Sequence, residues 1–122
     1  MKIVVDTSIW IDYFRSGNPV LRNLLETSRV CIHEMIIGEL ALGNFKNRHR
    51  VLSFLRDLPS LPLVSHERVL DFVERHQLMG SGIGWVDAHL LAATAQTQYQ
   101  LWTRDKRLLT VAQSLQLAYC PS

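Results

Sequence analysis

The sequence lacks several features that would assign it to a special class of protein. No run of apolar residues approaches the ~20 that a helix needs to cross a bilayer. Cysteine occurs only twice, at Cys31 and Cys120, and neither has a C-x-x-C partner. This spacing argues against a disulfide framework and a zinc site, so we expect two buried, reduced thiols. No internal repeat, low-complexity tract or linker divides the chain.

The first residues and the overall charge also show no special pattern. The first residues, Met1–Asp6, follow a strand pattern without a cleavable signal layout, so we expect a cytoplasmic protein with no membrane contact. The net charge of +2 permits nucleic-acid binding but does not argue for it. With 122 residues, 48% of them apolar and 20% charged, the chain is expected to form one globular domain over 1–122.

What the sequence does contain is an alternation of strand and helix patterns. Short apolar runs predict strands at 2–5, 30–33, 63–65, 100–103 and 117–120. Helical periodicity and capping residues predict helices at 7–15, 19–28, 34–42, 46–58, 67–79, 85–97 and 106–115. This alternation predicts an α/β fold, a three-layer α/β/α sandwich with a central parallel sheet. In such sheets the functional site lies beyond the carboxyl ends of the strands.

Four of the eleven acidic residues occupy positions that a solvated helix face does not explain. Asp6 ends the first predicted strand, and Asp105 comes shortly after a later one, so both lie at carboxyl ends of strands. Glu39 and Asp87 each interrupt an apolar helical stripe that should face the core. Each acid alone has a structural explanation, such as a helix cap. Together they predict a site, which we call the four-acid cluster.

The chemistry of such a cluster points to a metal ion. Four carboxylates in one pocket repel one another and resist ionising together, and a bound cation relieves that repulsion. Ligands that are all oxygen select Mg²⁺ or Mn²⁺ over zinc. A site of this kind can polarise a phosphodiester and activate a water for in-line attack. Ser8 and Thr103 lie beside Asp6 and Asp105 and are candidates to orient carboxylates or waters, with helix capping as the open alternative.

The residues around these acids resemble the PIN-domain nucleases. The resemblance rests on four blocks in a characteristic order, Val4–Ser8, Gly38–Leu40, Trp85–Ala95 and Thr103–Lys106. The short length and the order of the blocks are most similar to VapC-type toxins of bacterial toxin–antitoxin pairs. Ser8 stands where many relatives have asparagine, and the resemblance strengthens Thr103 as a candidate site residue.

This resemblance implies both a fold and an activity. The expected protein is an α/β/α sandwich that acts as an endoribonuclease toxin dependent on Mg²⁺ or Mn²⁺. It also implies a homodimer, an RNA substrate and inhibition by a cognate VapB-like antitoxin. The four-acid cluster would supply both the catalytic and the metal-binding residues, Asp6, Glu39, Asp87 and Asp105. All four are present, so nothing indicates an inactive relative.

Four other functions can be distinguished from a metal-dependent nuclease, either by experiment or by residues of the chain. A non-catalytic module of the same fold that only binds RNA or a protein is one alternative, and metal-dependent cleavage would exclude it. A metal-free ribonuclease using His33 or His89 is another, which chelation would distinguish. A receiver-like domain would need an acceptor Asp in the segment 63–66, which has none. A haloacid-dehalogenase-like phosphatase would need a second Asp at the position of Ser8.

Two neighbouring segments bear on the predicted site. Three cations, Arg104, Lys106 and Arg107, surround Asp105, where phosphate contacts would be useful. The glycine-rich segment Gly80–Gly84 lacks the G-x-G-x-x-G spacing of a dinucleotide-binding loop. We expect it to be a flexible turn that delivers Asp87, and we expect Trp85 to pack at the start of the next helix rather than to stack on a base.

Overall fold

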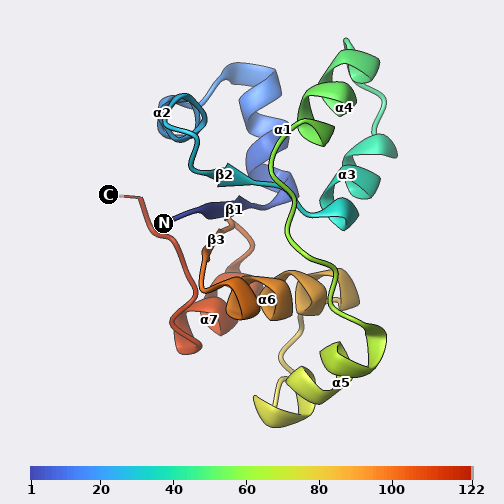
Figure 1. Ribbon diagram of the computed structural model, residues 1–122, viewed down its shortest axis with the longest axis vertical. Coiled ribbons are helices and arrows are strands. Elements are labelled where there is room, and N and C mark those ends of the chain that lie inside the picture. Colours follow the sequence, from blue (N-terminus) through green and yellow to red (C-terminus); the bar gives the residue numbers. More distant parts are fainter. Residues whose placement is uncertain (122) are drawn as a thin grey trace.

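The computed structural model describes residues 1–121 as a three-stranded parallel sheet with helices on both sides (Figure 1). The strands β1 (Ile3–Val5), β2 (Val30–Cys31) and β3 (Gln100–Trp102) lie in the order β2-β1-β3. The helices are α1 (Thr7–Ser16), α2 (Pro19–Glu26), α3 (Glu34–Ala41), α4 (Arg48–Arg56), α5 (His66–Arg75), α6 (Trp85–Thr97) and α7 (Lys106–Ser114). The predicted α/β class with a central parallel sheet is confirmed.

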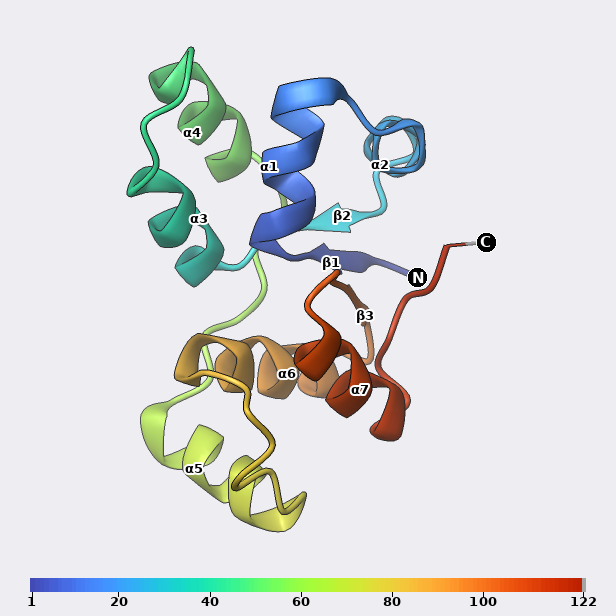
Figure 2. The same cartoon turned by 180° about the vertical axis from the view of Figure 1, so that it is seen from behind.

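The sheet is the middle layer of the molecule. Helices α1 to α4 lie on one side of it and α5 to α7 on the other (Figures 1 and 2). The three residues of the central strand β1 are fully buried, as expected for a parallel strand that is covered on both faces. Helix α6 packs against both β3 and α5, which explains why its residues from Ala88 to Thr94 are all buried.

Local capping determines where several helices begin. Asp6 caps α1 by accepting a hydrogen bond from the Thr7 backbone N–H, and Asn18 caps α2 with Pro19 at the first helical position. Asp105 caps α7 in the same way. The predicted starts of α1, α2, α3, α6 and α7 are confirmed, because these signals act within a few residues of the helix end.

The predicted strand at 63–65 is wrong. This stretch is extended but pairs with no strand: Leu63 is 60% exposed, and Ser65 instead caps α5. Pro62 precedes it and has no N–H to donate to a ladder. The pairing in this region is one bridge between Ile32 and Ser60. A short apolar run therefore marked a connection between the two helical layers rather than a strand.

The predicted strand at 117–120 is also reduced to a single bridge, between Leu101 and Ala118. Strand β2 is shorter than predicted because His33 leaves the sheet and caps α3. Of the two thiols, Cys31 is buried as expected, whereas Cys120 is exposed, which corrects that expectation. No helix within residues 1–121 is both long enough and apolar enough to span a membrane.

Candidate active site

The four acidic side chains predicted as a cluster line one open cleft of about 520 Å³. Asp6 lies between β1 and α1, Glu39 on α3, Asp87 in the first turn of α6, and Asp105 before α7. Figure 2 shows why they meet: α1, α6 and α7 all begin on the side of the sheet where the strands end, and α3 lies beside them. The remaining lining residues are Thr7, Ser8, Ile11 and Arg104.

Asp6 is held by hydrogen bonds at the floor of this cleft. The Thr103 hydroxyl donates to its Oδ2 at 2.7 Å, and the Thr7 N–H donates to its Oδ1 at 2.9 Å. Thr103 is itself fixed, because its Oγ1 accepts the Asp105 N–H at 3.1 Å. Thr103 thus links two of the acids: it orients the Asp6 carboxylate, and it stabilises the turn before α7 by accepting the Asp105 N–H.

Glu39 reaches the cleft from an exposed position on α3. The Thr7 hydroxyl donates to Glu39 Oε1 at 2.7 Å. The core-facing positions of α3 are Ile36 and Leu40, so the expectation that Glu39 lies on a buried stripe is wrong. Sequence analysis did not select Thr7 as a candidate, and its position directly after Asp6 was the one signal for it.

Asp87 is oriented by the turn that precedes its helix. The Gly84 N–H donates to Asp87 Oδ2 at 3.1 Å, as in a capping box. This contact places the carboxylate at the first turn of α6, where the helix dipole favours a negative charge. Asp105 is anchored similarly, since its Oδ1 accepts the N–H groups of Arg107 and Leu108, each at 3.0 Å.

The acids also affect one another electrostatically. Burial raises the pKa of Asp87 above its ordinary value, and the negative charges of Asp6, Asp105 and Glu39 raise it further, against the Gly84 hydrogen bond. Burial likewise raises the pKa of Asp6, with smaller contributions from Glu39 and Asp105, while hydrogen bonds from Thr103 and Thr7 lower it. The protein therefore holds Glu39 and Asp105 close enough to Asp6 and Asp87 for their negative charges to oppose ionisation of these two carboxylates.

The donor set of the cleft fits a hard divalent cation. The four acidic side chains that line it are carboxylates, and a positive charge among them would relieve the repulsion that adds to the effect of burial on the pKa of Asp87. Within residues 1–121, no three His, Cys, Asp or Glu side chains already converge tightly enough to enclose an ion. Mg²⁺ suits such an open arrangement, because it usually keeps several waters and takes only one or two protein carboxylates directly.

Ser8 also faces the cleft, and its Oγ is buried without a hydrogen-bond partner among the described residues. A buried hydroxyl of this kind usually bonds to a protein group or a water. Ser8 thus remains a candidate for orienting a water or carboxylate.

The two histidines of the metal-free alternative lie away from the cleft. His33 is fully buried, and its Nδ1 accepts the Met35 N–H at 3.0 Å. His89 is 6% exposed, on the buried side of α6. Burial lowers the pKa of both imidazoles, with further lowering of His33 by His89 and of His89 by His66. Neither side chain lines the cleft, so the geometry does not favour a histidine mechanism.

Trp85 packs at the start of α6, as expected. Its ring centroid lies 5.1 Å from that of His66 and 4.9 Å from that of His89. The side chain is still 40% exposed beside the turn that positions Asp87.

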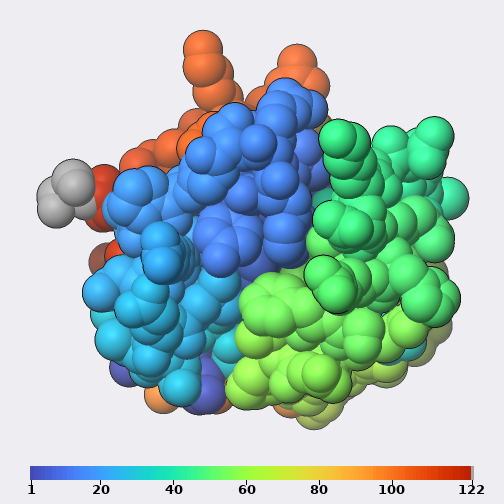
Figure 3. Space-filling model, turned by 90° about the horizontal axis from the view of Figure 1, so that it is seen from above, coloured from blue at the N-terminus to red at the C-terminus, as the bar shows by residue number. Residues whose placement is uncertain are grey.

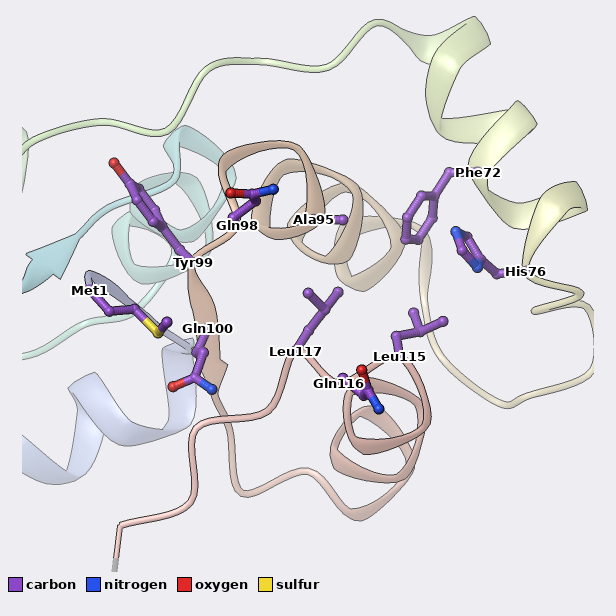
Figure 4. Close-up of a pocket in the computed structure, with 10 residues that line it drawn as sticks. All are labelled: Met1, Phe72, His76, Ala95, Gln98, Tyr99, Gln100, Leu115, Gln116 and Leu117. Carbon is purple, nitrogen blue, oxygen red and sulfur yellow. The ribbon is translucent and has the colours of Figure 1, made fainter.

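A second cavity, of about 420 Å³, lies at the opposite edge of the sheet (Figure 4). Met1, Tyr99 and Gln100 line it near the amino-terminal ends of β1 and β3, together with His76 and Leu117. No acidic residue is among its lining residues, so it offers none of the chemistry of the four-acid cluster.

Comparison with known proteins agrees with this geometry. The model of the PIN domain family matches residues 3–113. Ribonuclease VapC32 of Mycobacterium tuberculosis is 46% identical over 107 residues, which cover 87% of this chain and 86% of that protein. Ribonuclease VapC1 of Methanocaldococcus jannaschii is 32% identical over 110 residues, covering 87% and 77%. A solved structure of FitAB bound to an IR36 DNA fragment shares the fold, with a TM-score of 0.59, 17% identity and coverage of 91% and 90%.

Proposed function

The chain belongs to the PIN domain family and is a VapC-type toxin endoribonuclease, and from this premise we propose that its four-acid cluster cleaves RNA with the help of Mg²⁺ or Mn²⁺. The observation that carries the proposal is the convergence of Asp6, Glu39, Asp87 and Asp105 on one open cleft. The non-catalytic alternative is not favoured, because the relatives are ribonucleases and the four carboxylates all reach this cleft.

The residues of the cleft have two kinds of proposed role: the acids would bind the cation or accept a proton, and the hydroxyl residues would orient them. When bound, a divalent cation supplies Lewis-acid polarisation of the phosphodiester and a more acidic water. Asp6 and Asp87 are the most buried of the four acids and would hold the cation. Glu39 and Asp105 are exposed at the rim, where they can accept a proton from an attacking water. Thr103 and Thr7 keep Asp6 and Glu39 aimed into the cleft, and we propose that Ser8 orients a water.

The direct test is cleavage of total bacterial RNA by the purified chain with Mg²⁺, with the new RNA ends mapped by sequencing. We expect discrete cleavage sites. A Glu39→Gln variant purified in parallel is the matched control, and we expect it to lose most of the activity because it removes one charge at the exposed rim. Intact RNA, or the same fragments at the same rate from both preparations, would contradict the proposal.

The family also implies partners. We propose that a VapB-type antitoxin inhibits the protein, that the protein acts as a homodimer, and that it acts in the cytoplasm, where its RNA substrates lie.

A groove of about 320 Å³, lined by Ile11, Phe14, Arg15, Leu40, Phe45 and Lys46, suits the apolar part of such an antitoxin. Figure 3 looks down on this side, where the blue surface of α1 adjoins the green surface of the α3–α4 segment. Ile11 lines both this groove and the cleft, so the two surfaces are continuous.

Inhibition is expected to depend on a basic side chain of the antitoxin placed among the four acids. A guanidinium pairs bidentately with carboxylates and would take the place of the cation. An alanine scan of the basic residues in the antitoxin tail, with ribonuclease activity and affinity measured in parallel, checks this. One substitution should restore at least about tenfold more activity while weakening the complex less, since apolar contacts would supply most of the affinity. If no basic residue affects inhibition, the antitoxin does not act by occluding the cleft.

A further inference from the structure

Arg104, Lys106 and Arg107 surround Asp105 in the sequence. The side chains of Arg104 and Arg107 make different contacts in the structure. The Arg104 guanidinium forms an ion pair with Asp12 of α1, so a carboxylate partly neutralises it. Arg107 extends in another direction, toward the turn between α5 and α6, and lies against Gly82. Because α1 and the α5–α6 turn lie on opposite sides of the sheet (Figure 2), the two arginine side chains contact opposite helical layers.

The backbone of Gly82 forms the surface on which Arg107 lies. A Cβ atom added at Gly82 would lie 2.7 Å from Arg107 Cδ and 3.1 Å from its Nε. Gly82 also has a φ of 86°, in the left-handed region that favours glycine. Both the backbone conformation and the space over it therefore depend on the absence of a side chain at position 82. The Arg107 side chain therefore lies across the backbone of Gly82 in the structure.

The charge on Arg107 is not used within the protein. Among residues 1–121, its guanidinium takes part in no ion pair and no hydrogen bond, and the residue is exposed. Arg107 is nevertheless close to the cluster: its backbone N–H donates to Asp105 Oδ1, and its side chain lies against Gly82, two residues before the Gly84 N–H that donates to Asp87. A polyanion approaching four carboxylates is repelled unless cations at the rim meet its phosphates.

We propose that Arg107 binds a backbone phosphate of the RNA neighbouring the one that is cleaved, so that the strand crosses the cleft over the α5–α6 turn. This inference rests on the proposed ribonuclease function and adds a residue and a direction to it. A guanidinium suits this task, because it can bind a phosphate through two parallel N–H donors. Gly82 contributes because it has no side chain, which allows Arg107 to lie against its backbone. Arg104, already paired with Asp12, contributes less to RNA affinity.

The test separates substrate binding from chemistry. For the wild type, Arg107→Ala and Arg107→Lys, the kinetics are measured at several salt concentrations on an oligoribonucleotide that spans a mapped cleavage site. Arg107→Ala should raise KM about tenfold with kcat nearly unchanged. It should also make the negative slope of log(kcat/KM) against log[salt] shallower by about 0.7, as expected for one lost phosphate contact to a single strand. Arg107→Lys keeps the charge and should restore the slope. Arg56→Ala, which removes an exposed cation from α4 in the other helical layer, is the matched control and should change neither quantity.

A second measurement keeps this inference distinct from the proposed function. Affinity for the same labelled oligoribonucleotide is measured by fluorescence anisotropy in the Asp87→Asn background, with and without Arg107→Ala or Arg56→Ala. Loss of about tenfold in affinity with Arg107→Ala but not with Arg56→Ala supports the assignment. Equal effects of the two substitutions, or an Arg107→Ala change confined to kcat and melting temperature, would overturn it. Failure of the wild type to cleave RNA would instead contradict the proposed function.

Discussion

An Asp87→Asn variant is expected to lose RNA cleavage by more than about a hundredfold while keeping its fold. Changes to groups that merely support a metal ligand already cost ~10–100-fold, and this substitution removes a charge from the cluster itself. The amide has nearly the same shape and retains an oxygen that can accept the Gly84 N–H, so the start of α6 is preserved. Initial cleavage rates and circular dichroism measure the two effects.

The same variant is expected to have a higher melting temperature than the wild type when no divalent cation is present. Burial and the three neighbouring carboxylates raise the pKa of Asp87 in the folded state above its ordinary value of 3.8. As the pH rises from that value through the raised pKa, the unfolded chain releases its proton first, and the wild type loses stability. The asparagine carries no such cost, so its advantage should be full at neutral pH and disappear below the ordinary value.

Cation binding provides the complementary measurement. Mg²⁺ should raise the melting temperature of the wild type by binding the native state, and should raise that of Asp87→Asn much less. Asp71→Asn, at an exposed position on α5, is the matched control and should behave like the wild type in all three assays. A variant at Asp87 that cleaves at nearly the wild-type rate would show that this residue only caps its helix.

Removal of divalent cations is expected to abolish cleavage entirely. The ionisable donors in the cleft are carboxylates, which require a hard cation to offset their charge, and no histidine lines the cleft to replace it. EDTA should reduce the rate to that of the uncatalysed reaction, and added Mg²⁺ or Mn²⁺ should restore it. Zn²⁺ should restore less, because it favours nitrogen and sulfur ligands.

Two controls make the chelation experiment specific. Circular dichroism in EDTA should show an intact fold, since the core of β1, α1 and α6 is built from apolar contacts and contains no proposed metal ligand. A metal-independent ribonuclease in the same buffer should keep its activity, which shows that the RNA remains cleavable. Undiminished cleavage after exhaustive chelation would exclude the metal mechanism and favour the one based on His33 or His89.

Local signals explain how much of this protein was predictable from its sequence. The predicted bounds of α6, 85–97, match the structure, and the starts of four other helices were also correct. Capping by Asp6, Asn18 and Asp105 depends on groups within three residues of each other. The meeting of Asp6 and Asp105 was predictable for a related reason, because residues that follow the strands of a parallel sheet lie at one edge of it. Glu39 and Asp87 lie on helices, so their place in the cleft depends on how α3 and α6 pack.

Only the tertiary structure decided which residues became partners across long stretches of the chain. Thr7 and Glu39 are 32 positions apart, and Thr103 and Asp6 are 97 apart, so no local pattern could pair them. The ion pair of Arg104 with Asp12 and the course of Arg107 over Gly82 likewise depend on how two helical layers close around the sheet.

The error at 63–65 has the same origin. An apolar run forms a strand only where a neighbouring strand offers hydrogen bonds, and here the chain passes between the layers, leaving Leu63 exposed. The sequence by itself thus determined the α/β class, the starts of five helices and the place of Asp6 and Asp105 at one sheet edge, because short-range hydrogen bonds and strand order dictate them. The hydrogen bonds that aim those acids, and the cations that flank them, were decided by packing between distant segments.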